Sequence, residues 1–339
     1  MISISVCMIV KNEEQVLARC LNSLAGLYDE LIIVDTGSSD RTLSIAHKYT
    51  DRVFSFEWCD DFSAVRNYAL QFATMDYIYC ADADEVIDSE NRERFLKLKQ
   101  TLTDDIEIVQ MLYINQLQYN TVYNFDRELR PKLYRRSNNF HFEGPVHEKI
   151  NVPESCHIFS SDICIQHCPQ NLHRDRDFSI FLRKYGNGEY LTPHLLTQYS
   201  KELFICGNRE DFLSAAPVYE NQLSNQSLAP ESILEICCVL LNVALLQDNQ
   251  RNFLKYSLKG LACNGCSELF YIIGLYYFET EDYDEAVIWF YNAAFEASSV
   301  LNVKYCTTLP LNALADSYDK LNMSDIANEY RSRALTVTL

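Results

Sequence analysis

The sequence lacks a long apolar run. None of its stretches approaches the about 20 consecutive apolar residues that cross a bilayer, and the apolar segment 273–278 ends at Glu279. The first residues also lack the basic region, the long apolar segment and the small-residue cleavage site of a signal peptide. The sequence therefore predicts a cytoplasmic protein with no membrane span.

Basic residues are scarce as well. The 339 residues include 29 Lys and Arg against 47 Asp and Glu, which gives a formal net charge of -18. A protein that binds nucleic acid needs a basic surface that neutralises many phosphates. The composition therefore excludes nucleic acid as an expected partner.

Cysteine is present but is not arranged as a disulfide framework. The 13 cysteines are scattered through a chain of moderate length, and several, such as Cys7, Cys80 and Cys237, lie inside apolar stretches. Buried reduced thiols are expected of such a pattern. Cys263 and Cys266 form a C-x-x-C without a second pair at zinc-finger spacing, so a zinc site is not predicted there.

The first hundred residues alternate between apolar strands and amphipathic helices. Apolar runs predict strands, and apolar residues at helical spacing predict helices. The strands are expected over 2–10, 30–35, 52–56 and 77–81, and the helices over 14–27, 39–49 and 62–73. This alternation predicts an α/β domain with a doubly wound, mostly parallel sheet, whose ligand site lies at the carboxyl ends of the strands.

The pattern changes after residue 104. Extended segments over 106–117, 130–134 and 163–167 are expected to add antiparallel strands to the sheet, and from about Phe178 the chain reads as helical almost without a break. We therefore predict an α/β domain over residues 1–180 and an all-α domain over residues 181–339.

The helical part contains a repeat. In residues 267–298, seven residues fall at the spacing of a tetratricopeptide repeat: Phe270, Ile273, Gly274, Tyr277, Ala286, Phe290 and Ala293. The frame recurs with Ala315, Tyr318, Ala327 and Ala334, residues 210–215 echo residues 281–286, and a degenerate copy spans 241–261. Small residues allow paired helices to approach, and large residues fill the space between repeats. The pattern predicts a tetratricopeptide-like array.

Polar residues follow two of the predicted strands. The turn that begins at Asp35 brings a carboxylate, Gly37 and Ser38 to the predicted ligand site, where they could hydrogen-bond a base or a ribose or simply cap the turn. Asp82 and Asp84 follow the strand 77–81, and in an extended segment they point to the same side. Two such carboxylates repel unless a cation such as Mg²⁺ or Mn²⁺ joins them. The alternative is a solvated acidic turn.

Arg66 precedes the acidic strand, near the start of the predicted helix 62–73. Its guanidinium could bind a diphosphate through two hydrogen bonds, or it could pair with Asp60 or Asp61.

Together these motifs resemble family 2 glycosyltransferases, in the branch whose members carry tetratricopeptide repeats behind a GT-A catalytic domain. The resemblance covers nearly the whole chain and is carried by residues 5–14, 33–42, 62–67, 82–85 and 142–148. It implies an inverting transfer from a nucleoside diphosphate sugar, with a UDP-sugar expected. It also implies a nucleotide-sugar site and a metal site, which would use Val10, Asn12, Glu13, Asp35, Gly37, Ser38, Arg66 and Asp82 for the donor and Asp82, Asp84 and His147 for Mn²⁺ or Mg²⁺.

An inverting transfer also needs a base that takes the proton of the acceptor. Glu148 is the predicted base, with Glu143 and Glu85 as alternatives. His147 is the predicted third metal ligand, with His167 as the alternative.

The sequence also departs from the family pattern. Thr36 replaces the second aspartate that is frequent in the V-D-D-G turn, and the absence of a Q-x-x-R-W motif disfavours a processive polymer synthase. The repeats favour a peptide or protein acceptor, because such arrays form concave surfaces for extended chains. A saccharide or lipid-linked saccharide acceptor, or a repeat scaffold with an inert transferase domain, are the alternatives, and homo-oligomer formation through the repeats is left open.

Overall fold

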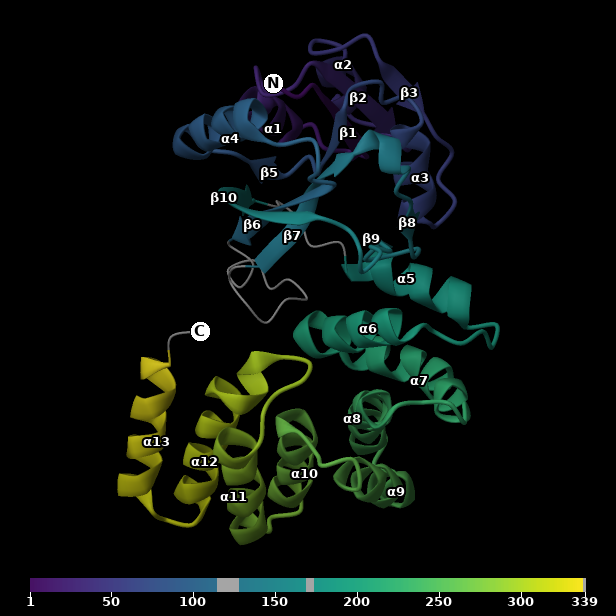
Figure 1. Cartoon of the computed structure of the whole chain (residues 1–339). Coiled ribbons are helices and arrows are strands. Elements are labelled where there is room, and N and C mark those ends of the chain that lie inside the picture. Colours follow the sequence, from purple (N-terminus) through teal and green to yellow (C-terminus); the bar gives the residue numbers. More distant parts are fainter. Residues whose placement is uncertain (115–127, 169–173, 338–339) are drawn as a thin grey trace. The chain divides into compact units, whose positions relative to one another are not determined.

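The computed structural model describes residues 1–114, 128–168 and 174–337 (Figure 1). The chain divides into two compact units. The described residues up to 168 form the first unit, and those from 174 onward form the second. In the described part of the chain no helix is long and apolar enough to cross a membrane.

The first unit is built on one mixed sheet. Its strands lie in the order β3-β2-β1-β4-β7-β6-β10-β5. The central strands β2 and β4 have the predicted bounds, because continuous apolar runs are typical of strands that are buried on both faces. The bounds of the strands in this sheet are β1 Ile4–Val10, β2 Glu30–Asp35, β3 Val53–Ser55, β4 Tyr77–Ala81, β5 Glu85–Val86, β6 Ile108–Ile114, β7 Glu128–Arg135 and β10 Ile158–His167.

Most neighbouring strands in this sheet run parallel, as predicted. β1 pairs in parallel with β2 and β4, and β2 with β3. β7 is antiparallel to both β4 and β6, as expected for the later strands. The same expectation is wrong for β10, which pairs in parallel with β6 and in antiparallel only with the short β5. β7 already pairs with one edge of β6. β10 therefore adds at the other edge of β6, where it runs in the same direction as β6.

Each face of the sheet is covered by a different set of helices. Alternate residues of β1, such as Val6 and Met8, pack on a core with α1 and α4, while Cys7 faces a second core with α3. The bounds are α1 Leu17–Leu24, α2 Thr42–Ala46, α3 Phe62–Leu70 and α4 Ser89–Thr101. A small hairpin of β8 (Phe142–Glu143) and β9 (Lys149–Ile150) contributes to the second core through Phe142.

The second unit is helical, as predicted. Its α-helices are α5 Arg174–Tyr185, α6 Pro193–Cys206, α7 Arg209–Leu223, α8 Pro230–Leu246, α9 Gln250–Leu261, α10 Ser267–Glu279, α11 Tyr283–Tyr291, α12 Thr308–Lys320 and α13 Ser324–Thr336. Figure 1 shows the later helices as a row of antiparallel neighbours.

Residues of the predicted repeat form contacts between α10 and α11. Ala286 and Phe290 are fully buried, and Phe290 packs directly over Gly274. A Cβ added at Gly274 would lie 2.6 Å from the Phe290 ring, which is closer than real Cβ contacts. Glycine is therefore needed at this position so that the two helices can approach.

Candidate active site

The first group of predicted site residues lies at the carboxyl ends of β1 and β2. Asp35 is buried, and its Oδ2 accepts hydrogen bonds from the backbone N–H groups of Gly37 at 2.9 Å and Ser38 at 3.0 Å. Gly37 has a φ of 96°, a backbone conformation that residues other than glycine rarely adopt. Asp35 therefore shapes its own turn.

The turn after β1 is tied to the turn after β2. The Asn12 N–H donates to Ser38 Oγ at 2.9 Å, and Asn12 Oδ1 accepts the Ser39 N–H at 2.8 Å. The Glu13 N–H donates to Thr42 Oγ1 at 2.7 Å. β1 and β2 are in register with Val10 opposite Asp35, so the polar turns end at the same level of the sheet. The structure thus brings part of the predicted donor site into one cluster, namely Asn12, Glu13, Asp35, Gly37 and Ser38.

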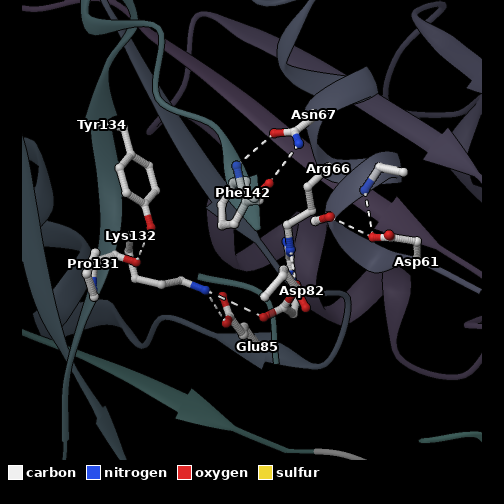
Figure 2. Close-up of polar contacts among 12 residues, drawn as sticks. Asp61, Arg66, Asn67, Asp82, Glu85, Pro131, Lys132, Tyr134 and Phe142 are labelled. Atoms are coloured by element: carbon white, nitrogen blue, oxygen red, sulfur yellow. Dashed lines mark hydrogen bonds and ion pairs between the residues drawn. The ribbon is translucent and has the colours of Figure 1, made fainter. Parts of the chain in front are cut away.

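Asp82, directly after β4, lies between two cations (Figure 2). Arg66 Nη2 donates to Asp82 Oδ1 at 2.7 Å, and Lys132 Nζ lies 3.6 Å from Asp82 Oδ2. Burial alone would raise the pKa of Asp82, but Arg66 and Lys132 outweigh it and hold the pKa far below its ordinary value. Asp82 therefore carries a negative charge that is already balanced by protein cations.

Glu85 lies beneath this cluster. Lys132 Nζ donates to its Oε1 at 2.5 Å, and Glu85 itself is 2% exposed. Burial raises the pKa of Glu85, Lys132 opposes this effect and the nearby Asp82 adds to it, with the result that the pKa lies well above its ordinary value. Glu85 is thus enclosed and bound to Lys132, which does not suit it to meet an acceptor.

Asp84 lies beside a histidine of β10, a strand near one edge of the sheet. Its Oδ2 lies 3.2 Å from His167 Nε2, because β10 pairs His167 with Glu85 of β5. His147, the predicted third ligand, lies instead in the β8–β9 turn with a φ of 50°. In the described residues there is no group of three or more His, Cys, Asp or Glu side chains arranged for a metal ion. Of the two histidines considered as the third metal ligand, it is thus His167 that the structure places beside Asp84.

The β8–β9 hairpin is fastened to α3. The Asn67 side chain exchanges two hydrogen bonds with the backbone of Phe142, at 2.8 and 2.9 Å (Figure 2). The Phe62 N–H also donates to the carbonyl oxygen of Pro145 at 2.9 Å. In this position Glu148 accepts a hydrogen bond from Arg66 Nε. Arg66 thus joins Asp82 and Glu148, two carboxylates that are distant in sequence.

The sequence of this chain is similar to those of known proteins. Residues 5–161 match the family model for glycosyl transferase family 2. The chain carries a family 2 glycosyltransferase domain. A TPR repeat-containing protein of Synechococcus elongatus is 36% identical over 151 residues, which are 44% of this chain and 36% of that protein. The SPbeta prophage-derived glycosyltransferase SunS of Bacillus subtilis is 32% identical over 144 residues, which are 42% of this chain and 33% of SunS. The matches thus span about a third of these relatives' length.

Solved structures also resemble parts of the chain. A Mycobacterium tuberculosis glucosyl-3-phosphoglycerate synthase in complex with Mn²⁺ and UDP-glucose is 14% identical, with a TM-score of 0.42 over 58% of this chain and 79% of that one. A structure of S. aureus TarS 1–349 is 16% identical, with a TM-score of 0.37 over 97% of this chain and 91% of that one.

One residue of this candidate site has only a weak signal in the sequence. Lys132 contacts both Asp82 and Glu85 but was not singled out. The only signal was a lysine inside the predicted strand 130–134, next to a proline, where a buried strand would be apolar. Its partners come from β4 and β5, and no local pattern reveals them.

Proposed function

We propose that this protein is an inverting, metal-dependent glycosyltransferase that moves a sugar from a nucleoside diphosphate sugar, a UDP-sugar, to a peptide or protein acceptor held with the help of the helical repeats. One observation carries the proposal. A guanidinium, Arg66, lies between Glu148 and Asp82, the residue directly after the parallel strand β4. Two residues further on, Asp84 pairs with His167. The carboxyl ends of such strands are where open α/β sheets bind their ligands.

The nucleoside would bind at the tied turns after β1 and β2. Asp35, Asn12 and Ser38 offer carboxylate, amide and hydroxyl groups that are already fixed by the backbone, which lowers the entropy lost on binding. Arg66 would bind the diphosphate, because a guanidinium matches two phosphate oxygens.

The residues present fit a divalent cation at Asp84 and His167. A carboxylate oxygen and an imidazole nitrogen 3.2 Å apart are close enough to share one ion, and Mg²⁺ or Mn²⁺ takes its remaining ligands from water and phosphate oxygens. When bound, the ion would neutralise charge on the departing diphosphate. Asp82 already has two protein cations as partners, so in this proposal it orients Arg66 and does not bind the metal ion.

Glu148 is the base in this proposal. As the acceptor's nucleophilic atom forms its bond to the anomeric carbon, the bond from that carbon to the diphosphate oxygen breaks and the acceptor's proton moves to Glu148. Attack from the side opposite the leaving group inverts the anomeric centre. Glu148 is only partly enclosed, with a side-chain exposure of 11%, whereas Glu85 is buried and Glu143 is exposed.

The repeats support a polymeric acceptor. Stacked helix pairs form extended surfaces that bind peptide segments. The relative from Synechococcus elongatus is named for its TPR repeats, and SunS is named a glycosyltransferase.

A screen of nucleoside diphosphate sugars tests the proposal. The full chain is incubated with UDP-, GDP-, ADP- and dTDP-sugars, and donor hydrolysis is measured with Mn²⁺, with Mg²⁺ and after chelation. We expect the UDP-sugars to be hydrolysed, and only when metal is present. Equal turnover after chelation would contradict the metal, and turnover of none of the donors would contradict the transferase.

A further inference from the structure

Lys132 owes its position to a break in β7. Val109 of β6 pairs with Leu133, but the next residue, Gln110, pairs with Pro131, so Lys132 is an extra residue in the ladder. Pro131 has no N–H to donate to the ladder, and its carbonyl oxygen accepts the Tyr134 hydroxyl at 2.8 Å (Figure 2). Such bulges shift the alternation of a strand and redirect a side chain.

The redirected side chain reaches the carboxylates from the side opposite Arg66. Lys132 Nζ lies 2.5 Å from Glu85 Oε1 and 3.6 Å from Asp82 Oδ2, and Arg66 holds the other oxygen of Asp82. Each oxygen of Asp82 therefore faces a cation from a different element. Oδ1 accepts a hydrogen bond from Arg66 of α3, and Oδ2 lies at ion-pair distance from Lys132 of β7. Attraction toward opposite sides favours one orientation of the carboxylate, and this in turn favours one orientation of the guanidinium bound to it.

Balancing the charge of Glu85 does not by itself explain why Lys132 is buried here. A buried Lys–Glu pair contributes little net stability, because the cost of removing two charges from water offsets their attraction. The Lys132 ammonium is also enclosed by aromatic rings, 5.5 Å from the Tyr113 centroid and 5.9 Å from that of Tyr79. This enclosure fixes the direction of the ammonium, and that direction includes Asp82.

We propose that Lys132 is a positioning residue: it fixes Asp82, and through Asp82 it holds Arg66 in the orientation that binds the diphosphate of the donor. This inference rests on the proposed function. Lys132 itself does not touch the nucleotide, so its effect on the diphosphate passes entirely through Asp82.

The test is a double-mutant cycle in a Glu85→Gln background. Glutamine keeps the shape of Glu85 without a charge, so the loss of Lys132 leaves no unpaired buried carboxylate at position 85. The full chains E85Q, E85Q/K132M, E85Q/D82N and E85Q/D82N/K132M are compared. Calorimetry with Mn²⁺ measures the affinity for UDP, GDP, ADP and dTDP, and the tightest diphosphate is then compared with its free nucleoside. Circular dichroism confirms that each variant is folded.

We expect K132M to weaken diphosphate binding about tenfold or more in the E85Q chain, with the nucleoside affected much less, because one oriented charge-assisted contact is lost. In the D82N background the same substitution should change diphosphate binding by less than about twofold, since Asp82 no longer transmits it. E85Q/K132R, which keeps the cation, should recover part of the affinity.

Three results would overturn the inference. No effect of K132M in the E85Q chain would mean that Lys132 only balances Glu85. An equal effect with and without Asp82 would mean that Lys132 contacts the phosphate directly. If the unmodified chain binds none of the four diphosphates, the proposed function fails and this inference fails with it.

Discussion

Replacement of Arg66 by alanine tests the donor site most directly. The side chain is 15% exposed and holds Asp82 and Glu148, so its loss removes the phosphate ligand and also leaves two carboxylates facing the diphosphate. A charge-assisted hydrogen bond contributes about 1.5–3 kcal/mol, and with the added repulsion we expect a total loss of about 2–4 kcal/mol. Diphosphate affinity should therefore fall about 30- to 1,000-fold.

The same substitution should barely change binding of the free nucleoside, because the tied turns after β1 and β2 remain intact. Calorimetry with the nucleoside diphosphate and ligand-observed NMR with the nucleoside measure the two affinities. Arg94→Ala is the matched control, since Arg94 lies on α4 and pairs with Glu90. Equal losses for both ligands, or an equal loss in the control, would refute the role of Arg66.

Arg66→Ala should also reduce the stability of the first unit. Removal of one partner from a buried ion pair leaves uncompensated charge and costs about 3–5 kcal/mol, and the partial exposure of Asp82 reduces this cost. Binding is therefore measured at a temperature at which circular dichroism shows the variant fully folded.

Three further predictions concern the metal and the repeats. Asp84→Asn should lower metal-dependent donor hydrolysis by about 100-fold or more without changing the circular dichroism spectrum, and unchanged hydrolysis would remove Asp84 from the metal site. Burial raises the pKa of Glu235 to about 7, so folding favours its protonated form and stability falls as the pH rises from the ordinary carboxyl range to about 7. Glu235→Gln should thus stabilise the protein by about 1–3 kcal/mol at pH 8 and much less at pH 4.5 in urea titrations, whereas the exposed Glu231→Gln should do neither. Gly274→Ala should destabilise the repeats by about 1–3 kcal/mol because the added methyl group meets Phe290, and an unchanged thermal midpoint would contradict this packing.

The sequence alone predicted much of the fold. β2 and β4 have their predicted bounds because a strand buried on both faces is a continuous apolar run. The repeat could also be predicted, since Gly274, Ala286 and Phe290 lie at the spacing of a tetratricopeptide repeat and form the helix contacts that this spacing implies. In the candidate site, the turn at Asp35 could be predicted because it follows the carboxyl end of a predicted strand, where open α/β sheets bind their ligands.

The tertiary structure decided which distant residues meet. Arg66 and Glu148 are 82 positions apart, and Lys132 reaches Glu85 across 47 positions. The direction of β10 was likewise predicted wrongly, and its pairing with β5 brings His167 to Asp84. The physical reason is that periodicity reports only the environment of each residue along its own element. Which strand lies beside which, and where a bulge redirects a lysine, depends on packing between segments far apart in the chain.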